Sequence, residues 1–159
     1  MLTESESRRI VIKDYTEENI PDVLLFEHTL REEEDVWGWE IDDKYISDVK
    51  ASFRDDRFQN ALSLLAWEDG RVIGRIDAVL IPSRFDGSVK AYMDWICVLQ
   101  SRRHRGAAQA LLAALRERLK ALGVDTLIAL TAANDEAQRF YKSVENSEMH
   151  DVGIWIDVK

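Results

Sequence analysis

Residues 91–131 constrain the fold of this chain more than any other stretch of its sequence. Residues 91–98 (AYMDWICV) have the composition of a strand, and residues 126–131 (TLIALT) form a short apolar strand of the buried kind. Between them, residues 106–122 carry leucines at 111, 112, 115, 119 and 122, the spacing of one helical face, and Gly123 ends that helix. Strand, helix and strand in one run predict a right-handed βαβ crossover.

Ahead of this unit, the sequence predicts one strand and two helices. Residues 9–14 alternate between apolar and polar side chains, as a short half-buried strand does. Thr16 can cap the helix that follows, which has two acids near its positive end and Pro21 in its first turn. A second helical pattern begins at Asp42 or Asp43.

Two further strands and a terminal helix and strand complete the pattern. Residues 61–67 and 72–81 flank an Asp-Gly turn, which predicts a β-hairpin. Residues 135–142 predict a helix, and residues 153–158 (GIWIDV) predict an alternating last strand. Consecutive strands followed by strands that alternate with helices predict an α/β (α+β) fold, with a mixed central sheet of about six to seven strands flanked by about four helices.

Composition limits the classes of protein to which the chain can belong. With 159 residues, 46% of them hydrophobic, it predicts one domain over residues 1–159, with an ordered core from about residue 8. A net charge of -9 argues against a nucleic-acid partner. No apolar run is long enough for a membrane span or a signal peptide, so we expect a cytoplasmic protein. Cys97 is the single cysteine, and the sequence shows no metal-ligand spacing.

The junction between the strand at 91–98 and the long helix predicts an anion site. Arg102, Arg103 and Arg105 precede Gly106, and residues 102–120 contain six basic residues against one acid. The first turn of a helix leaves main-chain N–H groups unpaired, and a glycine there lets an anion approach them. The alternative is an exposed basic helix start that keeps this end of the domain soluble. Neither a P-loop nor a GxGxxG fingerprint is present.

Two motifs at this spacing resemble those of the GCN5-related N-acetyltransferases. The run Arg103-His104-Arg105-Gly106-Ala107-Ala108 is similar to the family's Q/R-x-x-G-x-G/A loop. Asn134, Ala137 and Tyr141 are similar to its N-x-x-A-x-x-x-Y segment, and the element order agrees over nearly the whole chain. The chain departs from the family after Tyr141, where residues 144–147 (VENS) replace the usual Gly-Phe.

The resemblance implies an acetyl-CoA site. In the family the pyrophosphate lies on the loop that corresponds to Arg103, His104, Arg105, Gly106, Ala107 and Ala108. The pantetheine arm pairs with the preceding strand, here Ile96, Cys97 and Val98. The equivalents of Asn134 and Tyr141 contact the far wall of the cofactor, and the family places a general acid for the departing thiolate at Tyr141. The alternative for Tyr141 is a packed aromatic side chain on a short helix.

Acetyl transfer to an amine also needs a base, because a protonated amine cannot attack a thioester. In a regular strand, residues 92, 94, 96 and 98 share one face, so we expect Tyr92 and Asp94 to point toward the same cleft. The resemblance implies a base, direct or linked through water, at one of these positions. We expect Asp94 to be the base and Tyr92 to shape the pocket. The Cys97 side chain, on the opposite face, is expected in the core.

The acceptor is expected to be a cation. Residues 31–48 contain eight acids and two bases, and in this family the corresponding segment borders the acceptor cleft. Trp37 and Trp39 are expected to form an aromatic wall there, although a solvated loop pinned by tryptophans fits the same pattern. Polyamines, aminoglycosides and peptide amines fit this charge. Residues 72–85 also bear a faint resemblance to aminoglycoside 3-N-acetyltransferases.

These observations favour an acetyl-CoA-dependent N-acetyltransferase of a cationic primary amine, acting by direct attack in a ternary complex. One alternative is a non-catalytic acyl-CoA-binding regulatory module, and another is an interaction protein whose acidic face binds basic partners. A homodimer is a further expectation, because the strand expected at 153–158, with Trp155, can pair with a second copy.

Overall fold

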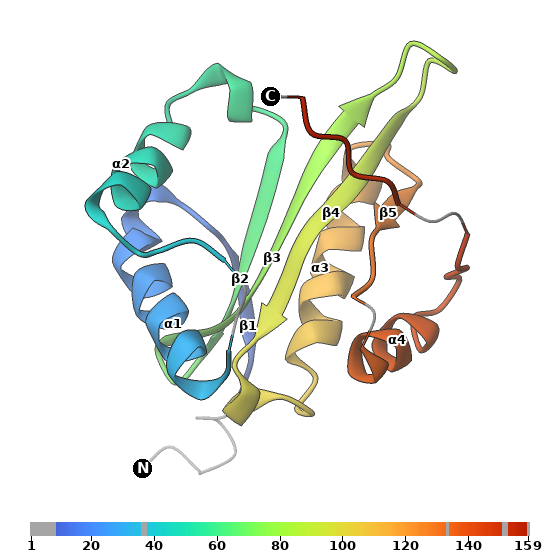
Figure 1. Ribbon diagram of the computed structural model, residues 1–159. Coiled ribbons are helices and arrows are strands. Elements are labelled where there is room, and N and C mark those ends of the chain that lie inside the picture. Colours follow the sequence, from blue (N-terminus) through green and yellow to red (C-terminus); the bar gives the residue numbers. More distant parts are fainter. Residues whose placement is uncertain (1–8, 36–37, 133, 151–152, 159) are drawn as a thin grey trace. The chain divides into compact units, whose positions relative to one another are not determined.

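The computed structural model describes residues 9–35, 38–132, 134–150 and 153–158 (Figure 1). The chain divides into two compact units, Met1–Ile128 and Ala129–Lys159. The expectation of a single domain therefore stays a prediction.

The first unit contains an antiparallel meander. β1 (Val11–Asp14) pairs with β2 (Ala61–Glu68), β2 with β3 (Arg71–Pro82), and β3 with β4 (Val89–Val98). β5 (Leu127–Ala129) completes the order β1-β2-β3-β4-β5, and the N–H of Ala91 donates to Thr126 O where the chain enters it. The meander and the β4–helix–β5 run confirm the predicted mixed α/β class.

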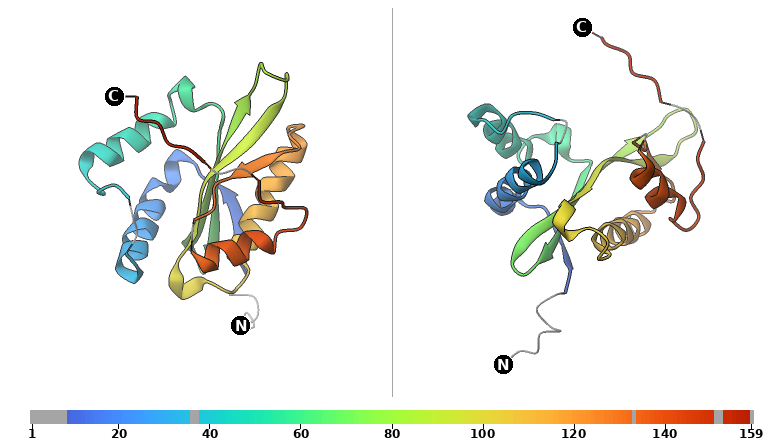
Figure 2. Two further views of the ribbon diagram at one scale, coloured as in Figure 1. Left: turned by 45° about the vertical axis from the view of Figure 1, so that its right-hand side comes forward. Right: turned by 60° about the horizontal axis from the view of Figure 1, so that its bottom comes forward.

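Helices cover both faces of this sheet. α1 (Ile20–Glu33) and α2 (Asp43–Ser52) lie on one face and α3 (Ala107–Ala121) on the other (Figures 1 and 2). α2 begins where its sequence predicts, because the Asp42 carboxylate accepts a hydrogen bond from the Tyr45 N–H at 2.8 Å.

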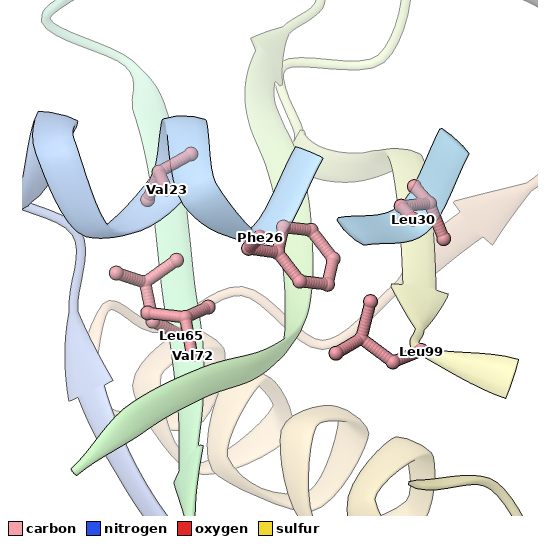
Figure 3. Close-up of a cluster of buried hydrophobic side chains, with 6 residues drawn as sticks. All are labelled: Val23, Phe26, Leu30, Leu65, Val72 and Leu99. Carbon is pink, nitrogen blue, oxygen red and sulfur yellow. The ribbon is translucent and has the colours of Figure 1, made fainter. Parts of the chain in front are cut away.

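The core beneath α1 is built from helix and sheet residues that are far apart in sequence. Figure 3 shows the cluster, which consists of Val23, Phe26, Leu30, Leu65, Val72 and Leu99. Burial of a side chain such as Phe26, which is 1% exposed, contributes about 1.5–3 kcal/mol. This cluster fixes α1 on the sheet and supports the start of the loop that follows β4.

A β-bulge in β4 changes the face on which its residues lie. Asp77 pairs with Trp95 and Ala78 pairs with Met93, so Asp94 has no partner on β3. One extra residue reverses the alternation beyond it. Tyr92 therefore shares a face with Trp95 and Cys97, and Ile96 and Val98 lie on the other. The prediction that residues 92, 94, 96 and 98 share one face is wrong, because it assumed an unbroken strand.

The second unit contains one helix and an extended tail. α4 (Asp135–Lys142) has the bounds expected from the sequence. Residues 153–158 form no strand among the described residues, so the prediction of a last strand is wrong and the sheet has five described strands. Alternation favours a strand, but a strand exists only where its backbone pairs with another. No helix in the described part of the chain could span a membrane.

Candidate functional site

Beyond its bulge, β4 presents main-chain groups along the edge that faces away from β3. The Leu99 N–H donates to Ile73 O at 2.9 Å, and antiparallel pairing then turns the N–H and C=O of Cys97 toward β3. The N–H groups of Ile96 and Val98 consequently point to the opposite edge. The Val98 C=O accepts from Arg103 Nε at 3.1 Å. Such an edge can pair with an extended ligand that carries amides.

The loop after β4 turns sharply into α3 through two left-handed residues. His104 has φ 60° and Gly106, the N-cap of α3, has φ 88°. A Cβ at Gly106 would meet no described atom within 4 Å, so the space that this Cβ would occupy at the N-cap of α3 is open. The first N–H groups of α3 have no partner within the helix and carry the positive end of its dipole. The outer edge of β4 and the N-terminus of α3 are thus joined directly by this loop.

Carboxylates from other elements hold two of the three loop arginines. Arg102 Nη1 lies 2.6 Å from Oε2 of the buried Glu68, and Arg103 pairs with Glu34. Arg105 Nη1 lies 3.8 Å from Glu68, and its side chain is 50% exposed. Arg102 and Arg103 therefore anchor the loop, and Arg105 is the arginine whose side chain lies half in solvent.

A buried ionic cluster on the α1 face of the sheet was not expected from the sequence. Glu27 is 0% exposed, and Arg75 Nη1 lies 3.3 Å from its Oε1. Arg75 Nε lies 2.6 Å from Asp77 Oδ2, and Asp77 Oδ1 accepts from Ser63 Oγ at 2.6 Å. Tyr45 Oη donates to both Glu27 oxygens, at 2.7 and 2.9 Å. One feature of the sequence could have indicated this cluster: an acid, Glu27, lies on the core-facing stripe of the first helix.

Burial sets the protonation of this cluster. Burial raises the pKa of Glu27 above its ordinary value, although the Tyr45 hydrogen bond and the Arg75 charge oppose the rise. Burial, with the Glu27 hydrogen bond, also raises the pKa of Tyr45. Burial alone would lower the pKa of Arg75, but the adjacent Asp77 outweighs it and the pKa rises. Tyr45 therefore stays protonated near neutral pH and donates to Glu27.

Aromatic side chains extend this cluster toward the bulge. The Trp39 ring lies 5.5 Å from the Tyr45 ring and 5.8 Å from the Trp95 ring, with an edge-to-face arrangement in the second pair. Trp39 is 41% exposed. Tyr92 is half-buried on the same face as Trp95. Trp37 lies outside the described residues.

The exposed Asp94 stands in the bulge itself, directly before Trp95 in the chain. In the first unit, Tyr92, Asp94 and the Ile96–Val98 edge thus follow one another along β4, and the loop at Gly106 comes after them. Cys97 packs against the core cluster, and burial raises the pKa of its thiol to about 11, so the thiol is neutral. Among the described residues no group of His, Cys, Asp or Glu could hold a metal ion.

The second unit places the other two predicted residues on α4. The Asn134 side chain caps this helix by accepting from the Ala137 N–H at 2.8 Å. The half-buried Tyr141 packs edge-to-face on Phe140 at 5.2 Å, and its C=O accepts from Ser147 Oγ at 2.9 Å. Asn146 takes a left-handed φ of 59°. The turn that departs from the family motif is therefore built from Asn146 and Ser147.

Comparison with known proteins gives a family and a fold. Residues 8–144 match the sequence model described as "Acetyltransferase (GNAT) family". A search of curated proteins finds no significant match.

Three solved structures illustrate the similarity of fold. An aminoglycoside acetyltransferase, meta-AAC0020 from an uncultured soil metagenomic sample, in complex with sisomicin, is 14% identical with a TM-score of 0.79, covering 94% of this chain and 97% of that one. The aminoglycoside N-acetyltransferase AAC(6')-Iy in complex with CoA is 22% identical with a TM-score of 0.75, covering 96% and 97%. A ribosomal-protein-alanine N-acetyltransferase from Brucella melitensis biovar Abortus 2308 is 17% identical with a TM-score of 0.71, covering 93% and 97%.

Proposed function

Because this chain belongs to the acetyltransferase (GNAT) family, we propose that it transfers an acetyl group from acetyl-CoA to a primary amine of a cationic acceptor. One observation carries the proposal. The outer edge of β4 beyond the bulge, at Ile96 and Val98, leads directly into a left-handed loop at the N-terminus of α3. Acetyl-CoA presents the matching chemistry in the same order, an amide-bearing arm followed by a diphosphate.

Main-chain groups and side chains of the loop at Gly106 both take part in binding acetyl-CoA. The N–H groups of His104, Arg105, Gly106, Ala107 and Ala108 bind the diphosphate, with the Arg105 guanidinium beside it. Arg103, paired with Glu34, holds the loop in place.

The arm of the coenzyme pairs with the main chain of Ile96 and Val98. Cys97 contributes little to that pairing, because its N–H and C=O are used by β3. Asn134 and Tyr141, in the second unit, keep the cofactor-binding roles that the family resemblance implies.

Two side chains transfer protons during acetyl transfer. Asp94, at the bulge, accepts a proton from the acceptor ammonium directly or through a water molecule. The amine nitrogen then forms a bond to the thioester carbonyl carbon, and the carbon–sulfur bond breaks. Tyr141 donates its proton to the departing thiolate, and the second proton lost by the amine nitrogen passes through water to the resulting phenolate. No acyl-enzyme is needed, because the amine attacks in a ternary complex.

The acceptor is proposed to be a cationic small molecule. The acidic segment at residues 31–48 supports this, and so does the similarity of fold to aminoglycoside acetyltransferases. Trp39, Trp95 and Tyr92 supply aromatic surface on which an ammonium group can rest. A homodimer and a cytoplasmic location remain predictions from the sequence.

Two measurements test the proposal in order. Thermal unfolding with and without acetyl-CoA or CoA should show stabilisation that grows with ligand concentration. Thiol release from acetyl-CoA should then depend on an added amine, with sisomicin and spermidine as the first probes and mass detection of the product. Absence of stabilisation would overturn the cofactor assignment. Stabilisation without thiol release across an amine panel would favour the acyl-CoA-binding regulatory module.

A further inference from the structure

Glu27 is an acid in a place where stability alone would favour an apolar residue. It lies on the core-facing side of α1 with Val23, Phe26 and Leu30, and its side chain is fully buried. Removing a carboxylate from water is costly, and well-packed apolar side chains often replace buried ion pairs without loss of stability. The position of Glu27 therefore calls for a role other than stabilisation of the core.

The contacts of Glu27 join α2 to the body of the first unit. Arg75, itself paired with Asp77, holds the carboxylate from the sheet side, and Tyr45 approaches it from α2 and donates to both of its oxygens. α2 itself has no buried residue. Its attachment consequently depends on a few side chains, of which Tyr45 makes the hydrogen bonds to a charged group, the stronger kind.

Tyr45 in turn supports Trp39, which packs on Trp95 of β4. Arg31 gives a second support from α1, because its Nη2 donates to Trp39 O at 2.9 Å and its guanidinium lies 5.5 Å from the Trp39 ring. Arg31 Nη1 also donates to Glu27 O at 3.0 Å. Trp95 directly follows Asp94, so this aromatic wall stands next to the bulge.

We propose that Glu27 is a positioning residue, which holds Tyr45 and through it Trp39 as a fixed wall where a cationic acceptor approaches Asp94. The inference rests on the proposed acetyl transfer. A fixed aromatic wall binds an ammonium group better than a mobile one, because less side-chain freedom is lost on binding. Glu27 itself need not touch the acceptor.

The test compares Tyr45→Phe with Tyr15→Phe, a matched control on the same face. Tyr15 is half-buried and its ring lies 4.9 Å from the Arg75 guanidinium, a contact that does not need its hydroxyl. The first readout is the free protein: the near-ultraviolet circular dichroism of Trp39, isolated by difference from Trp39→Phe, and hydrogen exchange of residues 39–45. The second is the KM for sisomicin against the KM for acetyl-CoA.

The inference predicts that Tyr45→Phe loses most of the Trp39 circular-dichroism signal and that hydrogen exchange of residues 39–45 becomes at least tenfold faster. It also predicts that the KM for sisomicin rises about tenfold, whereas the KM for acetyl-CoA changes less than twofold. Tyr15→Phe leaves all of these as in the natural chain. Glu27→Leu loses the Trp39 signal, and the conservative Glu27→Gln, which keeps an oxygen acceptor for Tyr45 Oη, retains most of it, a difference that a loss of stability alone does not produce. An unchanged Trp39 signal and unchanged exchange in Tyr45→Phe would overturn the inference. Equal changes of both KM values would also overturn it.

The free-protein readouts keep the two proposals apart. If acetyl-CoA does not bind at all, the proposed function fails while the Trp39 signal still reports on the support by Glu27. If acetyl transfer proceeds and the Trp39 signal does not respond to Tyr45→Phe, the inference fails and the proposed function stands.

Discussion

Replacing Gly106 by alanine separates the backbone role of this residue from its role in the proposed cofactor site. Gly106 has φ 88°, and an L-residue held in the left-handed region costs about 1–2 kcal/mol. A Cβ there meets no described atom within 4 Å, so no clash adds to this cost in the free protein. For a chain of this size the melting temperature should fall by roughly 2–8 °C.

Gly123 provides a matched control at the other end of α3. Its φ is 72° and a Cβ there also meets nothing within 4 Å, so Gly123→Ala should lose a similar amount of stability. The expected difference lies in binding, because only the Gly106 Cβ occupies the space in front of the first turn of α3. Calorimetric titration should show acetyl-CoA affinity at least tenfold weaker in Gly106→Ala, about 1.4 kcal/mol or more.

Thermal unfolding without ligand measures the stability of the two variants. Calorimetry at a temperature below both melting temperatures measures their acetyl-CoA affinity independently. Equal acetyl-CoA affinity in the two variants would refute the assignment of the diphosphate to this helix start. A much larger loss of stability in Gly106→Ala than in Gly123→Ala would show that the space in front of α3 is not open.

Three further predictions follow from the described contacts. Arg102→Ala leaves the buried Glu68 with the more distant Arg105, and urea unfolding should show a loss of about 1–3 kcal/mol, which Arg102→Lys partly restores. Tyr141→Phe should lower kcat far more than acetyl-CoA affinity, and comparable losses in steady-state kinetics and calorimetry would contradict its role as the acid. Burial raises the pKa of Glu27, so the folded state binds more protons than the unfolded state does. The contribution of Glu27 to stability therefore falls as the pH rises from the ordinary carboxyl range through the raised pKa. The unfolding free energy of Glu27→Leu relative to the natural chain should therefore increase between about pH 4 and pH 7, and a flat difference would contradict the raised pKa.

Features that depend on neighbouring residues were predictable from the sequence. The bounds of α4, the Asp42 cap of α2, the Asp-Gly hairpin and the leucine face of α3 each depend on a few adjacent side chains. The break at Gly106 belongs to the same class, because a left-handed backbone favours glycine wherever it occurs. Local propensity and hydrophobic period were sufficient for these elements.

Pairing between distant segments was not predictable in the same way. Residues 153–158 alternate like a strand but have no strand pairing in the described structure, and Asp94 is displaced by a bulge that depends on the register against β3. Arg103 was expected to face an anion, whereas it pairs with Glu34, 69 residues away.

The amino-acid sequence by itself determined the order of the helices and strands as far as α4, the family, and the loop that opens α3. The tertiary structure alone decided which face each residue of β4 presents, which carboxylate holds each arginine, and that Glu27 lies buried beneath Tyr45. The physical reason is that local preferences act over a few residues, whereas strand register, burial and ion pairing arise only when segments far apart in the chain pack together.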